Sequence, residues 1–200
     1  MHHMKTAFAG ALIATAIILA VAGLYFPYLH SAPEEIGVLG GVHEHANFAV
    51  YVDGAAFNFS QQKFMSNGSI KLSRFVHLHG LDGGTIHKHS TGVRLHHFFE
   101  SIGMSFNSSC ISLGDGQQFC SGNGKSLKMI VNGATSLEFG AYEFHDLDRV
   151  LISYGTAGNA ELKAQMGSVP DNACIPSGKC PERGTPAEES NCGADDNCTE

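Results

Sequence analysis

The chain has 200 residues and a formal net charge of −7, with 24 glycines, 12 histidines and no tryptophan. That length leaves room for one ordinary domain with short appendages. Acidic side chains outnumber basic ones, so the basic surface of a nucleic-acid-binding protein is missing and no nucleic-acid partner is expected. The composition indicates a glycine-rich, largely β-sheet protein.

An uncharged stretch at residues 6–29, "TAFAGALIATAIILAVAGLYFPYL", is long enough to cross a bilayer as a helix. Lys5 precedes it, and Glu34 and Glu35 follow it. Because Lys and Arg favour the cytoplasmic side, this bias places residues 1–5 in the cytoplasm and the rest of the chain outside. The sequence thus predicts a single-pass protein of the cell membrane with an extracytoplasmic C-terminal domain.

A cleaved signal peptide is the alternative interpretation, because "AVA" at 20–22 resembles a cleavage site. We favour an uncleaved transmembrane anchor, since the apolar run continues past that site to Phe26. Either interpretation exports the same domain. Residues 30–41 then form a linker between the membrane and that domain.

All six cysteines lie beyond the anchor, at Cys110, Cys120, Cys174, Cys180, Cys192 and Cys198. An even number of cysteines in an exported chain points first to disulfides. A three-residue loop at 114–116 would place Cys110 opposite Cys120, which predicts a cross-strand disulfide there. The other four repeat a Cys-x5-Cys spacing, and the sequence leaves their connectivity open.

Residues 42–53 alternate between apolar and polar side chains, as a half-buried strand does, and Asp53-Gly54 is a typical hairpin turn. One face of this strand would carry Ala46, Phe48, Val50 and Val52. The other would carry His43, His45, Asn47 and Tyr51. Glu44 is expected to face away from its two flanking histidines.

A second hairpin is predicted in "FVHLHGLDGGTIHKHS", with strands at 75–80 and 85–89. If residues 82–84 form a three-residue loop, His79 lies opposite His87. In the same register His77 lies opposite His89.

Residues opposite one another, and residues two apart on one strand, share a face of the sheet. This register therefore gathers all four imidazoles on one face and leaves Val76, Leu78 and Ile86 on the other. A two-residue loop would shift the register by one residue and separate the histidines.

The helical spacing of Leu95, Phe98, Phe99 and Ile102 predicts a helix, capped by Ser90 or Thr91 and ended by Gly103. Short strands follow up to Gly155. We expect an α+β fold: after the transmembrane helix, a β-rich domain over residues 42–157 with a β-grasp-like antiparallel or mixed sheet and one packed helix. Residues 158–200 form an acidic, cysteine-containing tail with one short helix, either held by disulfides or mobile.

Imidazoles two apart on a strand can converge on one metal ion at about 2.0–2.1 Å. The predicted ligands are His77, His79, His87 and His89, and His43 and His45 could complete the same site or build a second. Imidazole nitrogen favours Zn²⁺ or Cu²⁺ as the bound ion. The alternative is a solvated polar face that is merely rich in histidine, and His96, His97 and His145 are weaker candidates of that kind.

Three likenesses to known families arise from these motifs. The segment "LKMIVNGATSLEFGAYEFHDLDRVLISYG" resembles the end of ubiquitin-like sulfur-carrier proteins, which implies a β-grasp fold without the carriers' C-terminal Gly-Gly. "VHLHGL" resembles the first His-x-His-Gly motif of multicopper oxidases, but His-Cys-His is absent. "HEHANFAVYVDG", "VHLHG", "IHKHSTGVRL", "FFESIGM" and "CPERGTP" together resemble membrane-anchored, His-rich archaeal proteins of uncharacterised function.

The function predicted from these features is metal binding, of copper or zinc, by a membrane-anchored extracytoplasmic protein. The expected partners are the metal ion and, through the N-terminal helix, the membrane; the sequence identifies no protein partner. The alternatives are an extracytoplasmic metalloenzyme of hydrolase or oxidase type, a thiol–disulfide protein, or a surface interaction module without metal. The sequence identifies no catalytic acid or base.

Overall fold

The structure, a computed structural model, describes residues 35–66 and 72–186. The predicted cytoplasmic segment 1–5, the predicted anchor 6–29 and the predicted disulfide residues Cys192 and Cys198 lie outside this part. The chain divides into two compact units, Met1–Glu35 and Ile36–Glu200, and the helices and strands of the described residues all belong to the second. Within the described residues, no helix combines the length and the apolar character needed to span a membrane.

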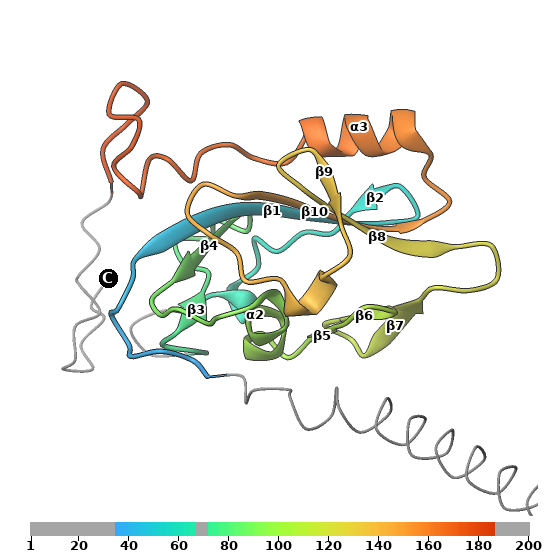
Figure 1. The fold of residues 1–200 in the computed structure, drawn as a ribbon, viewed down its shortest axis with the longest axis horizontal. Helices are drawn as coiled ribbons and strands as arrows, with labels where there is room; N and C mark the ends of the chain where they lie inside the picture. Colours follow the sequence, from blue (N-terminus) through green and yellow to red (C-terminus); the bar gives the residue numbers. More distant parts are fainter. Residues whose placement is uncertain (1–34, 67–71, 187–200) are drawn as a thin grey trace, which may run out of the picture. The chain divides into compact units, whose positions relative to one another are not determined.

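A mixed seven-stranded sheet is the frame of the domain (Figure 1). Its main path runs β3-β4-β1-β10-β8-β9, and the short strand β2 also pairs with β1. The strands are β1 (Glu44–Val52), β2 (Ala55–Ala56), β3 (Val76–His77), β4 (Thr85–Lys88), β8 (Ser126–Val131), β9 (Ala134–Ser136) and β10 (Arg149–Gly155). The central strands β1 and β10 are parallel, and the other pairs are antiparallel.

A smaller three-stranded sheet follows helix α2 (Leu95–Ser101) along the chain and contains β5 (Ser105–Phe106), β6 (Cys110–Leu113) and β7 (Gln117–Cys120). Cys110 pairs with Cys120 across β6 and β7, and the two sulfurs are bonded. The predicted cross-strand disulfide is confirmed. The described residues also include helix α3 (Asn159–Gly167) and the 3-10 turns η1 (Gln62–Phe64) and η2 (Phe139–Ala141). The domain is therefore an α+β fold dominated by strands, as expected.

One face of the main sheet packs against α2 and carries the larger apolar core. Ala46, Phe48 and Val50 of β1 are buried on this face, as the alternation predicted. The Phe48 ring lies 5.1 Å from the Phe98 ring of α2 in an edge-on contact. Aromatic pairs of this kind add to the free energy gained from burying their area.

The opposite face is covered by α3 and the segment that follows it, and Figure 1 shows these on the other side of the sheet from α2. Leu151 of β10, Val169 and Ala173 are buried there. The Arg149 guanidinium donates to the backbone carbonyls of Met166, Val169 and Pro170. Part of the predicted tail, residues 158–186, is thus docked on the sheet.

Helix α2 begins later than expected, and the predicted caps Ser90 and Thr91 are wrong. The N-cap residue is Arg94, whose backbone amide donates to His97 Nδ1 at 3.0 Å. The Ser90 hydroxyl instead donates to the Thr91 carbonyl, and Thr91 and Gly92 form a turn ahead of the helix, with Gly92 at a φ of 75°. Gly103, with φ of 75°, follows the helix where the sequence predicted its end.

Candidate metal centre

The register of the hairpin β3–β4 differs from the expected one by two residues. His77 lies opposite His87, rather than His79 opposite His87 and His77 opposite His89. The connection is longer than a three-residue loop, because Gly80 and Leu81 take left-handed conformations and the Asp82 amide donates to the His79 carbonyl at 3.1 Å. A shift of two residues leaves each side chain on the same face of the sheet. The predicted register is therefore wrong, but the predicted clustering of the histidines on one face is kept.

Strand β1 adds a third histidine to this row, since His45 lies opposite His87. His45, His87 and His77 therefore line up across three adjacent strands. The rings of His45 and His87 meet edge-on with centroids 4.5 Å apart, and those of His77 and His87 stack at 5.8 Å.

The other three predicted ligands extend the row into one six-imidazole cluster. His43 lies 4.7 Å from His45 and 4.8 Å from His89, measured between ring centroids. His79 Nε2 lies 3.2 Å from His87 Nδ1. We call His43, His45, His77, His79, His87 and His89 the histidine cluster.

The tightest trio in this cluster is His43, His45 and His87, each of which offers a ring nitrogen within 4.8 Å of the other two. Nitrogens bound to one tetrahedral ion lie about 3.3 Å apart, given metal–nitrogen distances of about 2.0–2.1 Å. The three nitrogens are thus at most about 1.5 Å further apart than ligands of one ion. His45 and His87 are 1% and 3% exposed, whereas His43 is exposed, so this trio opens to solvent on one side.

Two hydrogen bonds orient rings of the cluster from outside. His77 Nδ1 lies 3.2 Å from the Ser73 carbonyl oxygen, which can only accept, so the neutral His77 ring carries its proton on Nδ1. Nε2 is then the nitrogen with the lone pair that a metal needs. His45 Nδ1 lies 2.8 Å from Ser177 Oγ in the docked C-terminal segment.

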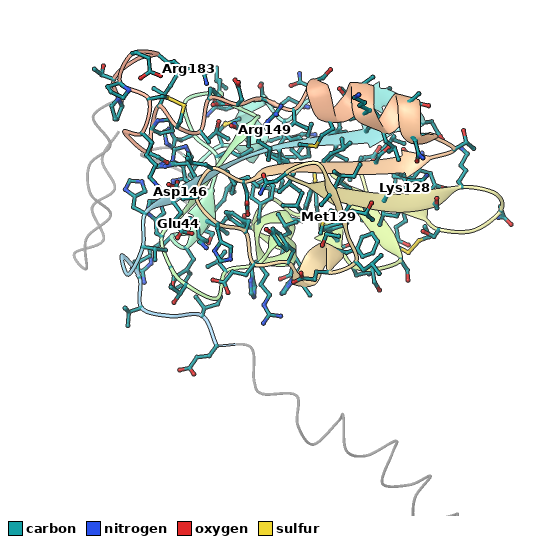
Figure 2. The ribbon with its side chains drawn as sticks, turned by 45° about the horizontal axis from the view of Figure 1, so that its top comes forward. Glu44, Lys128, Met129, Asp146, Arg149 and Arg183 are labelled. Carbon is teal, nitrogen blue, oxygen red and sulfur yellow. A yellow bond between two sulfur atoms is a disulfide. The ribbon has the colours of Figure 1, made fainter. Side chains whose placement is uncertain are left out.

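Asp146 contacts both His45 and Ser177. Figure 2 shows Asp146 and Glu44 at the end of the sheet where β1 begins. Its carboxylate accepts from the His45 backbone amide at 2.9 Å and from the Ser177 hydroxyl at 2.5 Å. The Lys179 ammonium lies 2.5 Å from its second oxygen. Burial raises the pKa of the Asp146 carboxyl, but the hydrogen bonds from Lys179, Ser177 and His45 outweigh it, and the net pKa is lowered. The same contact raises the pKa of Lys179.

Asp146→Asn is expected to make the free energy of unfolding depend less on pH in the acid range. A carboxyl whose folded-state pKa is lowered contributes stability in full above its usual pKa of 3.8, and loses it as the pH falls through the lower folded-state value. The variant should therefore be less stable than the wild type at pH 7 in urea unfolding, with a difference that shrinks to zero in strong acid. A difference that stays constant across this range would contradict the ionised contact.

Glu44 and Lys88 alternate with the histidines but occupy the opposite face of β1 and β4, as expected for Glu44. They lie directly opposite each other in the register, and Glu44 Oε2 lies 2.6 Å from Lys88 Nζ. Lys88 Nζ also donates to the Phe144 carbonyl at 2.5 Å. The buried ion pair on one face thus aligns the same two strands that carry His45 and His87 on the other.

The weaker histidine candidates lie elsewhere. His96 and His97 are on α2, where His96 Nδ1 contacts the Gly140 carbonyl at 2.8 Å and His97 caps the helix. His145 is exposed in the turn before β10. Among the predicted tail cysteines, Cys174 and Cys180 form a disulfide.

Ser177 and the contact role of Asp146 were not predicted from the sequence. Neither residue belongs to a periodic pattern. Both contact His45, which is 132 positions from Ser177 and 101 positions from Asp146 along the chain. The repeated Cys-x5-Cys spacing was the one signal that the segment around Ser177 is closed into a fixed loop.

The site brings together neutral nitrogen donors, a solvent opening and a carboxylate that supports one ring through a hydroxyl. This donor set fits a borderline divalent ion such as Zn²⁺ or Cu²⁺ better than Mg²⁺ or Ca²⁺, which prefer oxygen. Comparison with protein-family models, with curated proteins and with solved structures finds no match to this chain.

Proposed function

We propose that this protein is a membrane-anchored, extracytoplasmic metal-binding protein that takes up Cu²⁺ or Zn²⁺ in the histidine cluster. The observation that carries the proposal is the approach of His43, His45 and His87, whose ring nitrogens lie within 4.8 Å of one another. These three side chains are the primary ligands. His77, His79 and His89 supply further imidazoles around them.

The role is capture and release of an ion rather than permanent structural binding. Structural zinc sites are closed by four protein ligands, whereas catalytic sites have three protein ligands and keep one position open. The exposed position of His43 supports an open site, because a ligand at the surface can leave first and let the ion pass to an acceptor. Of the two ions, copper has the higher intrinsic affinity for imidazole where it is available.

The extracytoplasmic location rests on the uncharged stretch at 6–29 and on the disulfides. Cys110–Cys120 and Cys174–Cys180 are bonded, and such bonds persist in oxidising compartments. A relation to β-grasp proteins is supported by the order β4-β1-β10-β8-β9 with its central parallel pair. That relation bears on the fold alone, since one fold serves many functions.

The test is a calorimetric titration of the full chain, purified without an affinity tag in detergent, with Cu²⁺ and with Zn²⁺ at about pH 7.5. Stoichiometric binding is expected. His43→Ala changes an exposed position and leaves the core intact. Because His43 is a proposed ligand, the variant should weaken metal binding by more than about 100-fold. Removing a residue that only positions a ligand costs less, about 10–100-fold.

His145→Ala is the matched control, because His145 is also exposed but lies outside the histidine cluster. It should bind as the wild type does. Absence of stoichiometric binding, or equal affinities of the His43 and His145 variants, would refute the proposed function.

A further inference from the structure

A loop of the C-terminal region lies against the histidine cluster and contacts its most buried trio member. Ser177 in this loop is 2.8 Å from His45 Nδ1 through its hydroxyl oxygen. The same oxygen is 2.5 Å from Asp146 Oδ1. Asp146, Ser177 and His45 thus form a chain of contacts that ends on a proposed metal ligand.

The direction of these hydrogen bonds follows from the donors available. A hydroxyl has one proton, and an aspartate carboxylate can only accept. The Ser177 proton therefore points to Asp146, and the hydroxyl oxygen can only accept from His45. Nδ1 of the neutral His45 ring must then carry its proton, which makes Nε2 the nitrogen with the lone pair.

The position of Ser177 is fixed by covalent and hydrogen bonds around it. The Cys174–Cys180 disulfide closes the loop, with a Cα–Cα distance of 5.4 Å. The Ser177 amide donates to the Ala173 carbonyl at 3.2 Å, and the Lys179 amide donates to the Cys174 carbonyl at 2.8 Å.

The loop is also joined to the sheet beside the cluster. The Ala173 amide donates to Asn47 Oδ1 at 2.8 Å, and Asn47 Nδ2 donates to Asn172 Oδ1 at 2.7 Å. Asn47 follows His45 on the same face of β1, so the loop and the ligand share one rigid support. Cys180 and Ala173 are buried, which anchors both ends of the turn.

We propose that Ser177 is a positioning residue for metal binding: backed by Asp146 and held by the Cys174–Cys180 loop, it fixes His45 in the Nδ1–H tautomer and presents Nε2 to the ion. This inference rests on the proposed function for its consequence, although the tautomer can be measured without metal. Hydrogen bonds of this kind to the far nitrogen of a ligating imidazole are worth about 10–100-fold in metal affinity.

The first arm of the test is the tautomer of His45 in the metal-free full chain, from two-bond ¹H–¹⁵N NMR at about pH 8.5, where ordinary imidazoles are neutral. The wild type and Ser177→Thr, which keeps the hydroxyl, should show Nδ1–H. Ser177→Ala should lose that tautomer. An Nε2–H ring in the wild type, or an unchanged ring in Ser177→Ala, would overturn the inference.

The second arm is the Cu²⁺ and Zn²⁺ affinity of the same proteins. Ser177→Ala should bind about 10–100-fold more weakly, and Ser177→Thr should restore most of the loss. Removing the loop disulfide with Cys174→Ser and Cys180→Ser should weaken binding in the same direction. Removing the other disulfide with Cys110→Ser and Cys120→Ser is the matched control and should leave affinity unchanged.

The two arms separate this inference from the proposed function. Metal binding that is equal in the wild type and Ser177→Ala overturns the inference and leaves the metal site standing. An Nδ1–H ring that depends on Ser177 in a protein that binds no metal supports the positioning by Ser177 and refutes the metal site.

Discussion

Glu44→Gln is expected to lower the free energy of unfolding by about 3 kcal/mol, because it leaves the buried Lys88 ammonium without its nearest counter-charge. Lys88 is 1% exposed, and its Nζ lies 2.6 Å from Glu44 Oε2. The next carboxylate, that of Glu143, is 3.7 Å away. That second partner, together with the 24% exposure of the Glu44 side chain, places the cost at the lower end of the range for broken buried pairs.

The measurement is urea unfolding of the full chain, followed by circular dichroism. Asp53→Asn is the matched control, because it breaks the Lys125–Asp53 pair, whose side chains are 41% and 47% exposed. Surface pairs contribute about 0–1 kcal/mol, so this control should stay within that range. The double variant Glu44→Gln/Lys88→Met should recover most of the loss, since it removes the buried charge as well. Equal losses in Glu44→Gln and Asp53→Asn would contradict the assignment.

This pair also matters for the site on the other face. Glu44 and Lys88 are directly opposite in the β1–β4 register, one step from the opposed His45 and His87. A slip of one of these strands by one residue would separate Glu44 from Lys88 and also turn the histidines of that strand to the core face. The ion pair therefore makes that slip costly and keeps the imidazoles together.

The parts of the fold that follow from local patterns could be predicted from the sequence. Alternation along residues 42–53 indicated strand β1 and its buried face, and the glycine-containing loop at 114–116 indicated the Cys110–Cys120 pairing. The shared face of the hairpin histidines was predicted even though the register was not, because alternation fixes the face and leaves shifts of two residues undecided.

The contacts that complete the candidate site could not be predicted in the same way. Ser177, Asp146 and Asn172 form hydrogen bonds with residues that are distant in the sequence. Polar contacts of this kind produce no periodic pattern of residue types along the chain. The segment around Ser177 has few apolar residues, which suggested a tail without a core of its own. It is held instead by a disulfide, by Arg149 and by the Asn47 side chain.

Adding Zn²⁺ at about 100 times its dissociation constant is expected to raise the free energy of unfolding by about 2.7 kcal/mol at pH 7.5, provided that the ion binds only the folded chain. For a chain of this size the midpoint of thermal unfolding should rise by about 5–10 °C. The combined variant His43→Ala/His87→Ala should show no such rise, whereas His145→Ala should match the wild type.

The same stabilisation should disappear in mild acid, since the imidazole ligands bind metal only when neutral. A proton competes with the metal ion at each of the three imidazoles, so the affinity falls steeply as the pH is lowered. In mild acid at the same zinc concentration, the rise in the midpoint of thermal unfolding should therefore be lost. Carboxylate ligands would behave differently, because they stay ionised down to about pH 4. Zinc stabilisation that persists at pH 5 would therefore assign the ion to acidic side chains and refute a site made of His43, His45 and His87.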